Sequence, residues 1–148
     1  MCWHGLCAVN SMKDASALNA PYFGIDVPYM AHIGLQPLSL DHDGCRTFLA
    51  QQRVLTNSRG DMHGGVLMSA LDFTLSAAAR AHDPQRYGVI TIDMTTHFYE
   101  PGRTDLTVIA RCPRRGKSLA FCEGEILDAS GAVIAVARAT FKLLDLHE

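Results

Sequence analysis

The longest apolar pattern with helical spacing follows a polar turn at residues 56–61 and runs from about His63 to His82. Its apolar or nearly apolar positions cover most of the helix circumference: Val66, Leu67, Ala70, Leu71, Phe73, Thr74, Ala77 and Ala78. A helix that is apolar on nearly all sides is typical of a buried one. Asp83-Pro84 ends the pattern, because proline cannot continue the helical hydrogen bonds. The pattern predicts one long helix with a carboxylate, Asp72, in its middle.

Shorter elements precede this helix. Asp26 as an N-cap, Pro28 in the first turn and Gly34 after the last turn predict a short helix. Residues 35–40 and 45–52 predict two strands, and the Asp-Gly pair that ends the connection between them favours a hairpin turn.

The segment after the helix is rich in residues that favour strands. It predicts four strands, at residues 88–99, 104–112, 118–127 and 132–144. The regular spacing of the turns favours an antiparallel meander over βαβ units. Together with the hairpin, the predicted fold class is α+β, with about six antiparallel strands in a sheet curled around one central helix at about 63–82.

The chain of 148 residues has the size of a single domain and can bury a core without disulfides or metals. We expect residues 21–148 to form that domain and residues 1–20 to be a disordered tail, with Met12 as a candidate natural start that would leave residues 1–11 outside the native protein. The first residues lack the basic region of a signal peptide, and no segment has the apolar length of a membrane span. We therefore expect a cytoplasmic protein with no membrane partner.

Charge and cysteine spacing exclude several function classes. The net charge of −2 gives no electrostatic reason to expect nucleic acid as a partner. The five cysteines are scattered without a Cys-x-x-Cys pair, and the histidines lack ligand spacing, so we expect free thiols and no metal site.

The stretch 57–72 carries a motif of Asn57, Gly60, His63-Gly64-Gly65 and Asp72. These residues and their spacing resemble the hotdog-fold acyl-CoA thioesterases, specifically the phenylacetyl-CoA thioesterase-like (PaaI-like) family. The resemblance covers about residues 25–144. It implies a hotdog fold, hydrolysis of an acyl-CoA thioester to free acid and CoA, and no cofactor. It also implies a homodimer that assembles into a homotetramer as a dimer of dimers.

The motif also has a chemical interpretation. His63-Gly64-Gly65 places unpaired backbone N–H groups at a helix N-terminus, where the helix dipole favours negative charge and glycine permits close approach. Such donors can polarise a thioester carbonyl. Asp72 lies among apolar neighbours, where a carboxylate is costly to bury and is a functional candidate. The resemblance implies that Asp72 either activates water as a general base or attacks directly as a nucleophile, and the sequence leaves both open.

Helix geometry separates the two ends of the motif. Nine residues put Asp72 about 13.5 Å along the axis from His63, and at about 100° per residue they turn it to the opposite face. Asp72 therefore cannot serve the N-terminus of its own helix. A symmetric dimer with antiparallel helices would bring Asp72 of one subunit to Gly64 of the other, which predicts two shared active sites.

Other positions have supporting roles by resemblance. Asn57 would hydrogen-bond the water or the carboxylate, although an ordinary turn residue fits the same position. The Thr91 hydroxyl would help to orient the water, and His63 would orient its neighbours.

Two further residue sets concern the substrate. A basic connector is predicted at residues 113–117, between two strands, and we call it the basic turn. It is suited to bind the phosphates of CoA, and the predicted contacts are Arg114, Arg115, Lys117 and Ser118. Met68, Phe73, Phe98 and Tyr99 could line an aryl or medium-chain acyl pocket, but the same residues are ordinary core. The acyl preference stays open.

Three alternatives compete with hydrolysis. A hotdog dehydratase or hydratase of acyl thioesters pairs histidine with an acid and carries a proline after the histidine segment, which is absent here. A non-catalytic acyl-CoA-binding protein would not need Asp72. A structural dimerisation domain would need only the apolar helix.

Overall fold

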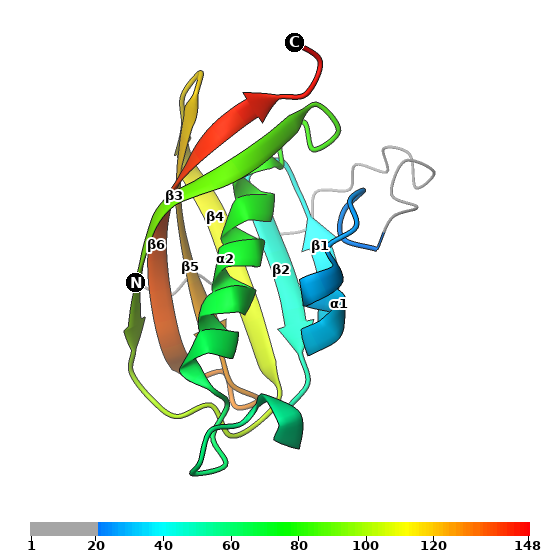
Figure 1. Cartoon of the computed structure of the whole chain (residues 1–148). Coiled ribbons are helices and arrows are strands. Elements are labelled where there is room, and N and C mark those ends of the chain that lie inside the picture. The colour runs from blue at the N-terminus through cyan, green and yellow to red at the C-terminus, as the bar shows by residue number, and fades with distance from the viewer. Residues whose placement is uncertain (1–20) are drawn as a thin grey trace.

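The computed structural model describes residues 21–148, so the predicted tail at residues 1–20 lies outside the described part of the chain. In chain order the elements are α1 (Pro28–Ile33), β1 (Leu35–Leu40), β2 (Gly44–Leu49), the 3-10 helix η2 (Arg53–Leu55), α2 (Gly64–Arg80), β3 (Tyr87–Phe98), β4 (Leu106–Arg115), β5 (Leu119–Leu127) and β6 (Val133–Asp145). The described strands form one six-stranded sheet in the order β1-β2-β4-β5-β6-β3, with every neighbouring pair antiparallel. The sheet curls around α2 (Figure 1), which confirms the predicted hotdog architecture.

The strand order corrects the predicted meander. Strands β4, β5 and β6 follow one another as a meander, but β3 pairs only with β6 and lies at the far edge of the sheet. The chain leaves α2 at one edge and returns to β4 beside β2 (Figure 1). Sequence patterns give strand positions, but they do not say which strands are neighbours.

Two local predictions also need correction. The N-cap of α1 is Val27 and not Asp26, because Pro28 is the first helical residue and so fixes the cap one position before itself. The basic connector predicted at 113–117 is mostly strand, since β4 continues to Arg115 past a register shift between Arg111 and Arg114. Gly34 ends α1 with φ 77°, as predicted.

The inner face of α2 packs into the core of the sheet. Leu71 and Leu75 have no exposed surface. A buried hydrogen bond of 2.8 Å joins the hydroxyls of Thr47 and Thr74, and Thr74 donates to the Ala70 carbonyl. A hydroxyl has one proton to donate, so Thr47 is the donor to Thr74. These contacts fix the rotation of α2 against β2.

One glycine of the sheet permits the close packing of β5. A Cβ atom at Gly124 would lie 2.8 Å from the Ile109 carbonyl oxygen and 3.2 Å from Leu75. No larger residue fits between β4 and α2 at this position without a backbone shift.

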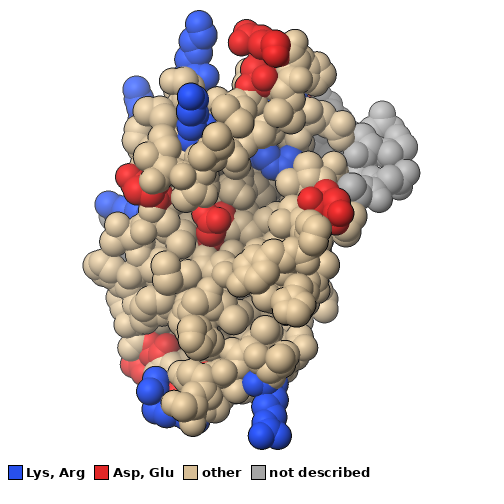
Figure 2. Space-filling model, in the orientation of Figure 1, with Lys and Arg blue, Asp and Glu red and all other residues tan. Residues whose placement is uncertain are grey.

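The outer face of α2 is open within the single chain. Gly65 and Met68 are exposed, and Ser69, Asp72 and Ser76 are half-buried. The prediction that the helix is buried on all sides is therefore wrong for one protomer. Figure 2 shows this face, where charged side chains gather mainly at the two ends and the middle is mostly uncharged.

The two edges of the sheet differ in a way that affects association. Strand β1 has six residues and contains Pro37, and both its short length and its proline discourage pairing with another chain. Strand β3 has twelve residues and exposes Ile90 and Ile92 by 52% and 54%. A long apolar edge strand is a template for pairing.

The described cysteines are Cys45, Cys112 and Cys122, and all three are free and buried. This agrees with the expectation of free thiols for these three positions. Burial raises the pKa of the Cys45 thiol well above its usual range. Cys2 and Cys7 lie outside the described residues.

Candidate active site

The start of α2 presents an unpaired backbone donor. His63 is the N-cap, and its Nδ1 accepts the N–H of Gly65 at 2.9 Å. The N–H groups of Val66 and Leu67 donate to the His63 carbonyl. Within the described part of the chain, the N–H of Gly64 donates to no acceptor. Of the two predicted oxyanion donors, only Gly64 is therefore free, because the Gly65 donor is used by the cap.

The cap explains the second glycine. A Cβ atom at Gly65 would lie 3.0 Å from His63 Nδ1, closer than side chains normally approach. Glycine at this position lets the imidazole fold back over the first turn. Because Nδ1 accepts this bond, the His63 side chain fixes the first turn of α2.

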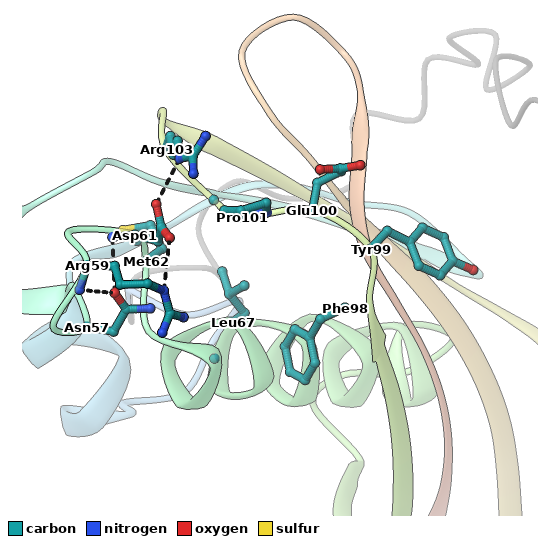
Figure 3. A pocket seen from close by; sticks show the side chains of 12 residues that line it. Asn57, Arg59, Asp61, Met62, Leu67, Phe98, Tyr99, Glu100, Pro101 and Arg103 are labelled. Atoms are coloured by element: carbon teal, nitrogen blue, oxygen red, sulfur yellow. Dashed lines mark hydrogen bonds and ion pairs between the residues drawn. The ribbon is translucent and has the colours of Figure 1, made fainter.

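A cavity of about 500 Å³ opens beside Gly64. Figure 3 shows its lining, in which Leu67 and Phe98 form the apolar part near the helix start. Asp61 is buried and accepts Arg103 Nε at 2.9 Å, with Arg59 Nε at 3.8 Å from the same carboxylate. These ion pairs hold the loop before α2 in place.

Asn57 organises that loop. Its Oδ1 accepts the N–H groups of Arg59 at 2.9 Å and of Asp61 at 3.2 Å. This is the turn geometry that asparagine commonly forms. Asn57 also lines the cavity beside Gly64, and its side-chain NH₂ makes no hydrogen bond to any described residue. The Asn57 Oδ1 thus stabilises the turn, and the Asn57 NH₂ remains available as a donor to the cavity.

Asp72 lies on the outer face of α2 and is paired across to the edge strand. Thr91 Oγ1 of β3 donates to Asp72 Oδ1 at 2.8 Å. Among residues 21–148, no arginine, lysine or histidine forms an ion pair with Asp72. The structure brings the predicted residues Asp72 and Thr91 together and leaves Asp72 Oδ2 without a described partner.

Asp72 and Thr91 line a second cavity of about 630 Å³, distinct from the one beside Gly64. Helix geometry separates Gly64 from Asp72 by about 12 Å along the axis. The two ends of the motif therefore do not meet within one protomer, as the spacing of the motif predicts.

The match to a family model decides the family. Residues 59–135 match the model of the thioesterase superfamily. This segment is more than half of the chain and includes Gly64, Asp72 and Thr91. The chain belongs to the thioesterase superfamily. Its chemistry is accordingly that of the family, the hydrolysis of thioesters.

Two individual proteins resemble the chain over most of its length. A protein of Halobacterium salinarum named as a candidate esterase is 27% identical in an alignment of 141 positions, which covers 88% of this chain and 93% of that protein. The crystal structure of S. sahachiroi AziG is 28% identical with a TM-score of 0.75, and covers 81% of this chain and 98% of its own.

The PaaI protein of E. coli, from the phenylacetic acid degradation operon, shares the fold. It has a TM-score of 0.75 at 20% identity, over 80% of this chain and 86% of its own. The resemblance to hotdog-fold, PaaI-like thioesterases that the motif carries is confirmed.

The basic segment 114–118, which contains the end of β4 and the turn after it, lies at the end of α2 opposite Gly64. Arg115 donates to the Ala78 and Ala79 carbonyls at 3.0 and 2.8 Å and to Asp43 Oδ1 at 2.9 Å. Its guanidinium therefore closes the C-terminus of α2. Arg114, Lys117 and Ser118 are exposed. This segment thus has two cations that are open to solvent, Arg114 and Lys117.

Sequence reasoning overlooked two buried charged residues, Asp61 and Arg80. Asp61 precedes the motif in a polar turn, where a carboxylate is usually solvated. Arg80 ends an otherwise apolar and alanine-rich run. An arginine next to such a run is the sequence feature that could have indicated its burial.

Other features of the described chain bear on cofactors and location. Within residues 21–148, His, Cys, Asp and Glu form no group of three or more that could hold a metal ion. No helix in that range has the length and apolar character needed to cross a membrane.

Replacing Thr91 by valine is expected to lower kcat for thioester hydrolysis about tenfold, because valine has the same shape but cannot donate to the Asp72 carboxylate. Thr91→Ser should restore most of the rate, since serine keeps the donor. Steady-state thiol release checks both variants. A valine variant with the kcat of the wild type would exclude a positioning role for Thr91.

Proposed function

We propose that the protein hydrolyses an acyl-CoA thioester to a free acid and CoA. The observation that carries the proposal is Asp72, a half-buried carboxylate with Thr91 as its described partner, at the wall of a cavity large enough for an acyl group. Thioesterase superfamily membership supplies the reaction class.

In this proposal the residues of the motif divide the chemistry between them. Asp72 takes a proton from water as the oxygen attacks the thioester carbonyl carbon, or it attacks that carbon itself. The Gly64 N–H, supported by the positive end of the α2 dipole, stabilises the oxyanion that forms. The C–S bond then breaks and the CoA thiolate leaves. In the first route the thiolate takes the proton that Asp72 received. In the second route it takes a proton from solvent, and water then hydrolyses the mixed anhydride on Asp72 to release the acid and restore the carboxylate. His63 and Gly65 hold the first turn of α2, and Asn57 offers its free amide N–H groups.

The proposed site needs two protomers, because Gly64 and Asp72 line different cavities of one chain. Two features support a homodimer: the long apolar edge strand β3 and the open outer face of α2 beside it. Pairing β3 with its copy about a two-fold axis would set the two α2 helices antiparallel, so that Gly64 of each approaches Asp72 of the other. A homotetramer, as a dimer of dimers, is a further expectation from the resemblance.

The CoA end of the substrate would meet the basic turn. Arg114 and Lys117 keep exposed charges for the phosphates, and the Ser118 hydroxyl adds a donor. Arg115 is engaged by α2 and Asp43, so its contribution would be to hold the turn and to add positive field.

Thiol release from a panel of acyl-CoAs tests the proposed function. The purified protein, without added metal or cofactor, is expected to release CoA from at least one member faster than a buffer blank. Cleavage of none of them would overturn the proposal. Binding of acyl-CoA without cleavage would favour the non-catalytic alternative, and hydration of an enoyl-CoA would favour the hydratase alternative.

A further inference from the structure

Arg80 is a buried cation beside the proposed acyl site. It is the last residue of α2 and is 3% exposed. Its Nη1 donates to the Pro84 carbonyl at 2.7 Å, and its Nη2 donates to the Tyr22 and Phe23 carbonyls at 3.3 and 3.4 Å. A guanidinium has five N–H donors, so these bonds leave Nε–H and one Nη1–H without a described acceptor.

The three carbonyl oxygens accept hydrogen bonds from Arg80, but they carry no net charge. In the described part of the chain, Arg80 forms no ion pair with a carboxylate. Burial lowers the pKa of the Arg80 guanidinium from its usual value, but the group stays charged at any ordinary pH. Buried charges are normally paired, because removal from water without a counter-ion is costly. The protein thus holds a positive charge whose partner is missing from residues 21–148.

The cavity lined by Asp72 is also lined by Arg80. The rest of the lining is largely apolar, with Ile25, Phe73 and Val89 among its residues. Asp72 and Arg80 are the charged residues of this lining. They stand eight residues apart on α2, which is about 12 Å along the axis. A ligand with its reacting carbon at Asp72 would therefore lay an apolar stem along α2 and bring its far end to a guanidinium.

We propose that the acyl groups accepted beside Asp72 carry a carboxylate at the end remote from the thioester, and that this carboxylate pairs with Arg80. Such substrates are mono-CoA thioesters of medium-chain dicarboxylic acids. This inference rests on the proposed function and specifies its substrate class. A single phosphate or a neutral aryl group fits less well, since the first lacks the apolar stem and the second leaves the charge of Arg80 unpaired.

Matched pairs of substrates test the inference with the full-length protein. Adipyl-CoA and hexanoyl-CoA have the same chain length, as do suberyl-CoA and octanoyl-CoA, and each pair differs in the terminal carboxylate. The wild type is expected to prefer the dicarboxylic member by about tenfold or more in kcat/KM, the range of one charge-assisted hydrogen bond. Arg80→Met should remove or reverse this preference, and Arg80→Lys should keep part of it.

Arg115→Met is the matched control. Arg115 also bonds backbone carbonyls at the end of α2, but it does not line the cavity that contains Asp72. The substrate ratio should therefore survive this change, whatever happens to the absolute rates. If the Arg80→Met protein does not fold, the wild-type ratio and the Arg80→Lys ratio decide.

The outcomes separate the inference from the function on which it rests. A wild type that cleaves the monocarboxylic member of both pairs as well as the dicarboxylic member overturns the substrate class but keeps the hydrolase. A dicarboxylic preference that persists in folded Arg80→Met overturns the role of Arg80 and leaves it a structural tether of the segment before α1. Cleavage of no acyl-CoA overturns the proposed function, and the inference with it.

Discussion

Replacing Asp72 by asparagine is expected to lower kcat for acyl-CoA hydrolysis by about 10²–10⁴-fold, the usual contribution of a positioned general base. Asparagine has the same shape and can still accept the Thr91 hydroxyl at 2.8 Å, so the local structure should persist. What is lost is the group that takes the proton of water or attacks the carbonyl. Thiol release under saturating substrate measures the change. Asp72→Ala should be at least as slow.

Asp105→Asn is the control for the loss of an exposed carboxylate. Asp105 lies just before β4, accepts the Gln51 N–H at 2.8 Å and lines neither cavity described above. Its replacement should leave kcat unchanged, because an amide oxygen can accept the same bond. If Asp72→Asn retained the rate of the wild type and of this control, Asp72 would not be the catalytic carboxylate.

Much of the fold follows from patterns that act over short distances. The apolar periodicity after His63 predicts α2 to within about two residues at each end, because the cap and Asp83-Pro84 are local signals. The alternating segments give each of the six strands for the same reason. Such patterns do not determine the order of the strands in the sheet. The position of β3 beside β6 depends on contacts between residues that are distant in the sequence. The edge that the dimer proposal uses was therefore not predictable from the patterns.

The candidate site divides in a similar way. A motif and a resemblance predict Asp72, Gly64 and Thr91 as site residues, and the structure adds that the Gly64 N–H is free while the Gly65 N–H donates to the cap. Arg80 was missed for a physical reason. A basic residue in the last turn of a helix is normally a solvated partner of the helix dipole. Its burial depends on the Tyr22 and Phe23 carbonyls, which are distant in the sequence.

Replacing Gly64 by proline is expected to lower kcat by about 10²–10³-fold, the cost of removing one oxyanion donor. Proline is favoured at the first helical position, and His63 before it has φ −62° and ψ 134°, a conformation compatible with a following proline. The variant therefore removes the N–H but should keep α2. Circular dichroism and thermal unfolding check that the fold survives. Gly64→Ala, whose Cβ would lie an ordinary 3.7 Å from Phe98, keeps the N–H and should lose less activity.

The two inactive variants together test whether the sites are shared. In a dimer of one Gly64→Pro subunit and one Asp72→Asn subunit, one site combines both changes and the other combines intact Gly64 with intact Asp72. A random mixture contains heterodimers as half of its dimers, each with one of two sites intact, so co-expression should restore about one quarter of the wild-type activity. Different affinity tags on the two subunits allow the heterodimer to be purified, with about half the wild-type activity expected.

A mixture of Asp72→Asn with Asp72→Ala is the control for this experiment, because no subunit pair in it has an intact site. Its activity should stay at the level of either variant alone. If each site lay within one protomer, both subunits of the purified Gly64→Pro and Asp72→Asn heterodimer would lack one essential group. The activity of this heterodimer would then be as low as that of the control mixture. That result would refute the shared site, even though each single variant had lost activity as expected. Recovery would require that the helix start of one chain completes the carboxylate site of the other.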